Sequence, residues 1–268
     1  MSEMNKMLRY ASWVSCGMVL ASLASPASAI DILRAKVYGY ETLKQGETEL
    51  SYMFGYVAKS DLTMNYFDKT GVAREKLVSH TAELEYGLTD RWSISVYGDF
   101  EQPKNEDLKF IQARSVVTRY RLFDKGERFF DPGIYFEYYV PQEHYRGAQR
   151  EKLEARIILE KNVRDWSIRV NPILEKGLSD GNLGEGLVLE YAASVFKEMS
   201  PQLAVGVEAY GEFGPLANTN SYNDQQHFLA PAVEYKIKDG MAVSAALAKG
   251  LTDATDDLIV KATFELEL

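Results

Sequence analysis

The sequence contains one cysteine, Cys16, and three histidines in 268 residues. Residues 30–268 therefore form no disulfide bond and offer no thiol nucleophile or cysteine metal ligand. Beyond the N-terminus there is no apolar run of about 18 residues, which excludes a helical membrane protein but not a membrane barrel. There is also no Lys/Arg-rich run, and the formal net charge is -9. Nucleic acid is thus not an expected partner.

The N-terminus has the features of a secretory signal peptide. Lys6 and Arg9 precede an apolar stretch over residues 11–24, and an A-x-A pattern ends at Ala29. A membrane-anchoring helix would need about 20 apolar residues. Lipidation at Cys16 would leave too short a hydrophobic segment ahead of the cysteine. We therefore predict a signal peptide over residues 1–29, followed by one exported domain over residues 30–268.

Polar and apolar residues alternate through almost all of this domain. In residues 92–100 (WSISVYGDF), apolar side chains occupy most of the alternate positions, which is the pattern of a β-strand with one apolar face. Similar runs predict twelve strands, at residues 47–58, 76–86, 92–100, 110–122, 133–140, 152–160, 166–174, 187–195, 202–213, 226–237, 241–249 and 258–268.

The connections between these runs favour a membrane barrel. With one exception, those after odd-numbered strands are longer than those after even-numbered strands, as in outer-membrane barrels with short periplasmic turns and longer external loops. The predicted fold is an all-β, up-and-down antiparallel transmembrane β-barrel of about twelve strands, in the cell outer membrane of a Gram-negative bacterium and in contact with its lipid. The alternative is a soluble periplasmic β-sandwich or lipocalin-like barrel.

Aromatic residues on the apolar faces support this prediction, because membrane barrels carry aromatic girdles at both interfaces. Core packing is the alternative for any single aromatic. We predict a second, smaller group at the long-loop end, with Phe100, Phe110 and Phe213 among its members. The girdle predicted near the short turns consists of Tyr86, Trp92, Tyr120, Trp166, Tyr191, Tyr235 and Phe264.

Two features interrupt the pattern. Pro172 and Pro231 lie inside predicted strands and cannot donate to the ladder, so each predicts a bulge. The run over residues 110–122 alternates poorly, because Gln112 and Arg114 share a face with later apolar residues. It predicts a strand that is kinked or starts later.

The hairpin ELEYGLTDRWSISVYGDFE and its later echo LEKNVRDWSIRVNP resemble uncharacterised proteobacterial outer-membrane barrels near the phenol meta-pathway outer-membrane proteins. The resemblance implies a barrel fold and a role in transport. The C-terminal run from Val260 to Leu268 is similar to the terminal strand by which the barrel-insertion machinery recognises its clients, although it ends on leucine rather than on an aromatic residue.

No motif for catalysis, cofactor binding or metal binding stands out. An outer-membrane phospholipase or lipid A deacylase needs a histidine beside a serine, and His80, His144 and His227 do not show that spacing. The acids in residues 253–257 lack the spacing of an EF-hand loop. We therefore expect a protein that is not an enzyme and has no cofactor or metal. The alternative is an outer-membrane lipid-modifying enzyme.

The polar face would line the barrel interior, and carboxylates outnumber basic groups on it. One interpretation is a narrow water-filled path for passive transport of small solutes, with a preference for cations or for partly apolar solutes. The other is a set of ion pairs that closes the lumen of a structural or adhesive barrel. The predicted lumen residues are Glu83, Glu85, Arg119, Arg121, Glu137, Glu154, Arg156, Arg169, Glu190, Glu208, Glu234 and Lys261.

Two of these acids are the best candidates for charge selectivity. Glu83 and Glu85 would face serines of the next strand, with no basic partner opposite, and their field would favour cations. The alternative, left open by the sequence, is that Arg119 and Arg121 neutralise them.

Overall fold

The structure is a computed structural model, which describes residues 31–142, 151–178 and 186–268. The predicted signal peptide and His144 lie outside these ranges. No helix in the described part of the chain is long and apolar enough to cross a membrane.

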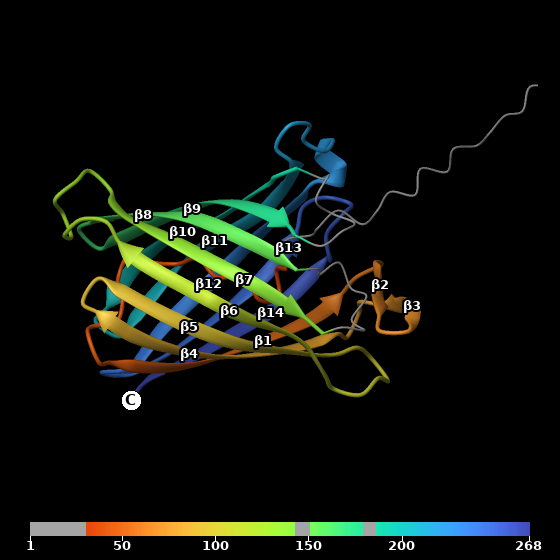
Figure 1. The fold of residues 1–268 in the computed structure, drawn as a ribbon, viewed down its shortest axis with the longest axis horizontal. Coiled ribbons are helices and arrows are strands. Elements are labelled where there is room, and N and C mark those ends of the chain that lie inside the picture. Colours follow the sequence, from red (N-terminus) through yellow and green to blue (C-terminus); the bar gives the residue numbers. More distant parts are fainter. Residues whose placement is uncertain (1–30, 143–150, 179–185) are drawn as a thin grey trace, which may run out of the picture.

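Within these ranges, twelve strands pair in antiparallel order and close into a barrel, as predicted (Figure 1). A separate hairpin of β2 (Thr63–Tyr66) and β3 (Lys69–Ala73) lies in the first long connection and was not predicted. The barrel strands are β1 (Thr48–Lys59), β4 (Val78–Thr89), β5 (Trp92–Gln102), β6 (Lys109–Arg121), β7 (Asp131–Pro141), β8 (Lys152–Val163), β9 (Trp166–Gly177), β10 (Val188–Ser200), β11 (Leu203–Pro215), β12 (Gln226–Lys238), β13 (Met241–Gly250) and β14 (Leu258–Glu267).

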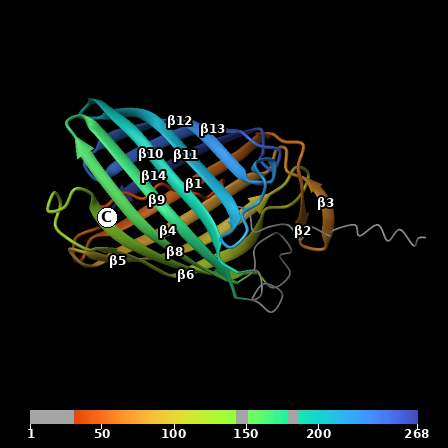
Figure 2. The same ribbon diagram turned by 90° about the horizontal axis from the view of Figure 1, so that it is seen from above.

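The two ends of the barrel differ, and we name them by their connections. The C-terminus lies at the short-turn end, whereas β2 and β3 lie at the opposite, long-loop end in both views (Figures 1 and 2). A single 3-10 turn, η1 (Tyr222–Asp224), lies between β11 and β12 in the described ranges. The connections at the short-turn end are residues 90–91, 122–130, 164–165, 201–202 and 239–240, of which 122–130 is the predicted exception.

The two strand prolines do not form the predicted bulges. Pro172 pairs with Tyr191 and Pro231 pairs with Val207 in ladders that keep their register on both sides. The pairing with β8 and with β13 lapses beside each proline and then resumes in the same register. The prediction was wrong because both side chains point outward, so a missing donor interrupts one ladder without requiring an extra residue.

Strand β6 does contain the predicted irregularity. Its register against β7 shifts between Ser115 and Thr118, and Val116 has a positive φ of 52°. Just before this bulge Gln112 and Arg114 face inward, and Gln112 is fully buried. After it the odd-numbered residues face inward. The change of phase explains the poor alternation of this run.

The lumen contains a segment that the sequence patterns did not reveal. Residues 31–47, the inner segment, run inside the barrel from the long-loop end to a turn at residues 44–47 that leads into β1 (Figure 1). The segment pairs with no strand, so wall side chains satisfy its backbone. Asn171 accepts a hydrogen bond from Tyr38 N (2.8 Å) and donates one to Tyr38 O (3.1 Å), and Arg156 donates to Lys36 O (2.7 Å).

An apolar cluster, the apolar seal, surrounds the first part of this segment in the long-loop half of the barrel. Val57, Leu77 and Ile259 are fully buried in it. Its members are Ile32, Leu33, Val37, Val57, Leu77, Ile173, Ala192, Tyr210, Phe228, Ala230, Ala246, Ala248 and Ile259.

The turn into β1 depends on a close approach to Gly87. Gly87 N donates to Glu47 O (3.0 Å), Gly46 N donates to Gly87 O (2.9 Å), and a Cβ atom at Gly87 would overlap the carbonyl of Lys44. We expect Gly87→Ala to lower the free energy of unfolding by about 1–3 kcal/mol, because backbone must move to relieve the overlap. Urea unfolding in lipid vesicles measures this change.

The matched control is Gly98→Ala on β5. A Cβ atom there would make an ordinary contact of 3.6 Å with the Phe100 ring. We expect no loss of stability in this variant. Equal unfolding midpoints for the two variants would show that the turn tolerates a side chain at Gly87.

Candidate functional site

The structure places all twelve predicted lumen side chains on the inner face of the barrel, but it divides them between two halves of the lumen. One half, lined by β4 to β9, is filled by side chains. The other half, lined mainly by β10 to β14 and β1, leaves a cavity beside the inner segment. The candidate site is this cavity.

A buried polar network fills the first half. Arg114 lies between Asp99 (3.0 Å) and Glu137 (3.1 Å), and each of these side chains is at most 4% exposed. Tyr135 donates a hydrogen bond to Glu137 (2.7 Å). Arg156 pairs with Glu154 (2.8 Å). These paired and closely packed groups fill this side, where the described residues enclose a cavity of only about 30 Å³.

The hydroxyl group of Tyr38 ties the inner segment to this network. It lies 2.9 Å from the hydroxyl of Tyr97 and 3.2 Å from that of Tyr135. Tyr97 in turn donates to Glu83. The Arg156 guanidinium lies 4.8 Å from the centre of the Tyr38 ring, in a cation-π contact. The segment is therefore anchored at mid-lumen by hydrogen bonds and ring contacts together.

Across the hairpin Glu85 faces Ser95, as predicted, but Glu83 faces Tyr97 and not a serine, and neither has a basic residue opposite it. Basic groups nevertheless reach both acids from elsewhere. Arg119 pairs with Glu85 at 2.7 Å, and Lys36 of the inner segment lies 3.9 Å from Glu83. Arg119 can reach β4 because the inward residues of the intervening strand β5 are the small side chains of Ser93 and Ser95. Arg121, which the alternative interpretation also paired with these acids, pairs instead with Glu41 of the inner segment (3.2 Å).

The second half stays open because its wall carries small residues. The cavity has a volume of about 300 Å³. It adjoins a space of about 470 Å³ at the short-turn end, and Glu49, Glu234, Ala242 and Glu265 line both. The alternating alanines and serine of residues 241–249 are the sequence signal for this space, because small inward side chains leave room beside the wall. The inward residues of β13 are Ala242, Ser244, Ala246 and Ala248.

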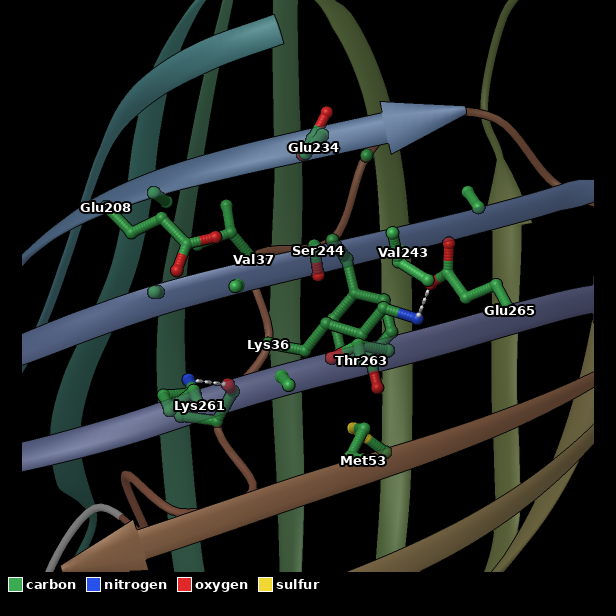
Figure 3. Close-up of a pocket in the computed structure, with 18 of the residues that line it drawn as sticks. Lys36, Val37, Met53, Glu208, Glu234, Val243, Ser244, Lys261, Thr263 and Glu265 are labelled. Carbon is green, nitrogen blue, oxygen red and sulfur yellow. Dashed lines mark hydrogen bonds and ion pairs between the residues drawn. The ribbon is translucent and has the colours of Figure 1, made fainter. Parts of the chain in front are cut away.

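Charged side chains project into the cavity from several strands (Figure 3). Lys36 pairs with Glu265 (2.8 Å), and Arg169 pairs with Glu234 (3.2 Å). Lys261 donates instead to the backbone carbonyl of Ala35 (2.5 Å). The inner segment therefore forms part of the cavity wall, and its Lys36 neutralises one of the acids that line the cavity.

The cavity ends at the apolar seal. Its lining reaches Leu33 and Ala246, which belong to that cluster. Beyond them Val57, Ala248 and Ile259 are all 0% exposed. In the described part of the chain, the cavity is thus accessible from the short-turn end and closed toward the long loops.

Most of the predicted girdle lies on the outer face at the short-turn end. Tyr86, Trp92, Tyr120, Trp166 and Tyr235 are each 39–46% exposed there. Phe264 is half-buried near the end of β14.

Tyr191 is a correction to this prediction. Strand β10 continues to Ser200, beyond the predicted end at residue 195, so Tyr191 lies near its start, at the long-loop end. Its ring packs there against Phe213 (5.4 Å) and His227 (5.8 Å between centres). Tyr191 therefore belongs with the aromatics of the opposite interface.

The described histidines contact aromatic and amide groups. His80 Nδ1 lies 2.5 Å from the Tyr52 hydroxyl. His227 contacts the hydroxyl of Tyr191 (3.1 Å) and Oε1 of Gln225 (2.8 Å). Neither is hydrogen-bonded to a serine or threonine hydroxyl among the residues the structure describes. That the protein is not an enzyme stays a prediction.

The acidic loop before β14 is held by basic side chains. Arg74 pairs with Asp256 and Lys59 with Asp257, both at 2.8 Å. Burial lowers the pKa of Arg74, but the hydrogen bonds and charge of Asp256 outweigh this effect and raise the pKa above its ordinary value. Within the described ranges, no group of three or more His, Cys, Asp or Glu side chains is arranged to hold a metal ion.

No model of a known protein family matches the chain, and no curated protein matches it. Among solved structures, it is similar to an outer membrane channel from Pseudomonas putida F1, with 12% identity, coverage of 87% of this chain and 100% of that chain, and a TM-score of 0.58. It is also similar to the Acinetobacter baumannii outer membrane protein Omp33, with 11% identity, coverage of 84% and 99%, and a TM-score of 0.43. A third similar structure is the outer membrane phospholipase A from Escherichia coli, with 12% identity, coverage of 84% and 97%, and a TM-score of 0.46.

The first of these similarities shows that the chain has the fold of an outer-membrane β-barrel. The narrower relationship to the phenol meta-pathway proteins stays a prediction.

Proposed function

We propose that the protein carries out passive transport of small solutes across the outer membrane, through the half of the lumen lined mainly by β10 to β14 and β1. The observation that carries this proposal is the cavity of about 300 Å³, which adjoins a mouth at the short-turn end while the other half of the lumen is filled. Short turns face the periplasm in outer-membrane barrels, so the mouth would open on that side. The similarity to an outer membrane channel agrees with the proposal.

Transport through this path requires the inner segment to move. The segment contributes Ile32, Leu33 and Val37 to the apolar seal, and Leu33 lies at the closed end of the cavity. An apolar constriction blocks ions because it excludes water. The segment is attached by side-chain hydrogen bonds such as those of Asn171, and not by a strand ladder. Its displacement would leave the barrel ladder intact.

The carboxylates of the mouth support a preference for cations. Glu49, Glu198 and Glu267 line it, and the acids of its lining outnumber its two lysines, Lys236 and Lys238. A low-dielectric wall focuses the field of this net negative charge into the opening. Glu83 and Glu85 are less suited to this role because both are buried and have a basic group nearby, Arg119 at 2.7 Å from Glu85 and Lys36 at 3.9 Å from Glu83. The proposed selectivity therefore depends on the mouth and not on the β4–β5 hairpin.

Single-channel recording in planar bilayers tests the proposed path. We expect small conductance steps from the native barrel, with a reversal potential that favours K⁺ over Cl⁻ in a KCl gradient. Ala246→Phe would fill the cavity and should lower the open conductance by about tenfold, since the filled half offers no second route. Leu247→Phe, on the lipid face of the same strand, is the matched control and should leave conductance unchanged.

A closed structural barrel is the second candidate, and the apolar seal is the observation that favours it. A native barrel that never conducts, or one whose conductance is the same after Ala246→Phe, would count against the proposed path. The first result would favour the closed barrel, and the second would indicate a route elsewhere in the molecule.

A further inference from the structure

Two carboxylates in the cavity, those of Glu49 and Glu208, differ from the other acids there because no described basic side chain forms an ion pair with them. The side chain of Glu49 accepts a hydrogen bond from Ser51 Oγ (3.2 Å), and that of Glu208 accepts one from the Tyr210 hydroxyl (2.8 Å). Among the residues the structure describes, neither carboxylate lies within 4.0 Å of a lysine or arginine nitrogen. The other acids that line the cavity are each paired with one.

The nearest candidate to neutralise Glu208 is Lys261, which is engaged elsewhere. Its Nζ atom donates to the carbonyl of Ala35 at 2.5 Å and lies 4.2 Å from the centre of the Tyr210 ring. Figure 3 shows this hydrogen bond to the inner segment, with Glu208 directed toward Val37. The carboxylate of Glu208 is therefore available to a bound cation.

Part of the cavity wall is apolar, beside the hydroxyl groups of Ser244 and Thr263. The basic side chains that also line the cavity are engaged, Lys36, Arg119 and Arg169 with acids and Lys261 with the carbonyl of Ala35. Val37 of the inner segment and Met53 of β1 face the cavity from one side, and Phe196, Ala232 and Ala246 face it from the other strands. A small metal ion would lose its hydration shell there without replacement, and no described group of side chains could hold one. An organic cation can pair its charged end with a carboxylate and bury its carbon chain against this wall.

We propose that the cavity binds an alkylammonium ion with a short carbon chain, with Glu208 as the deep partner of the charge and Glu49 as its partner near the mouth. The proposal rests on the transport function proposed above and names the class of solute. The ligand reaches the cavity from the short-turn end, where Glu198 and Glu267 attract cations.

Calorimetric titration of the full-length barrel, purified in detergent at neutral pH, tests the site. The probe is butylammonium, and butyrate and 1-butanol serve as anionic and neutral controls with the same chain. We expect butylammonium alone to bind. Glu208→Gln should weaken its Kd by about tenfold or more, because one partly buried ion pair is lost. Glu127→Gln, on the 122–130 turn, should leave the Kd unchanged.

A second variant removes the space without changing the charge. Ser244→Leu projects into the cavity from β13 and should abolish butylammonium binding. Heat-modifiable gel mobility verifies that each variant forms a folded barrel. Binding of butyrate as tight as that of butylammonium, or an unchanged Kd in folded Glu208→Gln, would overturn the proposal.

The same preparations in planar bilayers separate this site from the transport function. A barrel that conducts KCl but does not bind butylammonium would refute the cation site and leave the channel in place. A barrel that binds butylammonium through Glu208 but never conducts would refute transport and leave the site in place.

Discussion

Deletion of residues 32–43 is expected to convert the closed barrel into an open pore. These residues carry the parts of the seal and of the cavity wall that belong to the inner segment. Twelve strands lie between the eight that side chains can fill and the sixteen of water-filled porins, so the emptied lumen should hold water and raise single-channel conductance by about tenfold or more. Recording in planar bilayers measures the change against the native barrel.

A reversible lock is the companion experiment, since it retains the whole chain. A Cβ atom at Gly55 would lie 3.2 Å from Cβ of Leu33, slightly below the range of about 3.5–4.5 Å found in disulfides, so a small shift of the inner segment allows the bond. Residues 30–268 contain no other cysteine, so Leu33→Cys with Gly55→Cys can form only this bond within the domain. We expect the oxidised variant to stay closed and the reduced variant to conduct like the native barrel.

Two results would contradict the assigned role of the inner segment. One is a folded deletion variant with native conductance, which would mean that something else closes the lumen. The other is an oxidised double-cysteine variant that conducts as well as its reduced form, which would mean that solutes pass without displacement of Leu33.

Replacement of Asp99 by asparagine is expected to be strongly destabilising. Asp99 is fully buried and accepts hydrogen bonds from Thr81 (2.5 Å) and Gln112 (2.8 Å), while guanidinium nitrogens of Arg114 and Arg34 lie 3.0 Å and 3.6 Å away. Asp99→Asn leaves these buried cations short of one negative charge, and loss of one partner of a buried pair costs about 3–5 kcal/mol. Urea unfolding in lipid vesicles measures the loss.

The control for this prediction is Asp257→Asn in the loop before β14. Asp257 pairs with Lys59 at 2.8 Å, but both side chains are partly exposed. Loss of such a surface pair should cost less than about 1 kcal/mol. A similar small loss for Asp99→Asn would show that water or rearrangement compensates the buried guanidinium groups.

The sequence was sufficient for the barrel itself. Period-two alternation assigns an inner and an outer side to each strand, because successive side chains of a strand point to opposite faces. Residues 92–100 therefore place their serines inside and Trp92 outside, as the structure does. The unequal lengths of the connections then distinguish the short-turn end of the barrel from the long-loop end. Even the irregular run over residues 110–122 contains the signature of its bulge at Val116, which shifts the alternation from even to odd positions.

Only the tertiary structure decided which polar groups meet and what fills the lumen. The pairing of Arg119 with Glu85 spans the intervening strand β5, and alternation within single strands carries no information about contacts across a strand. The inner segment has no periodic signature, because wall side chains such as Asn171 and Arg156 satisfy its backbone instead of a ladder. Where such a segment lies depends on the shape and charge of a lumen that exists only after twelve strands have closed.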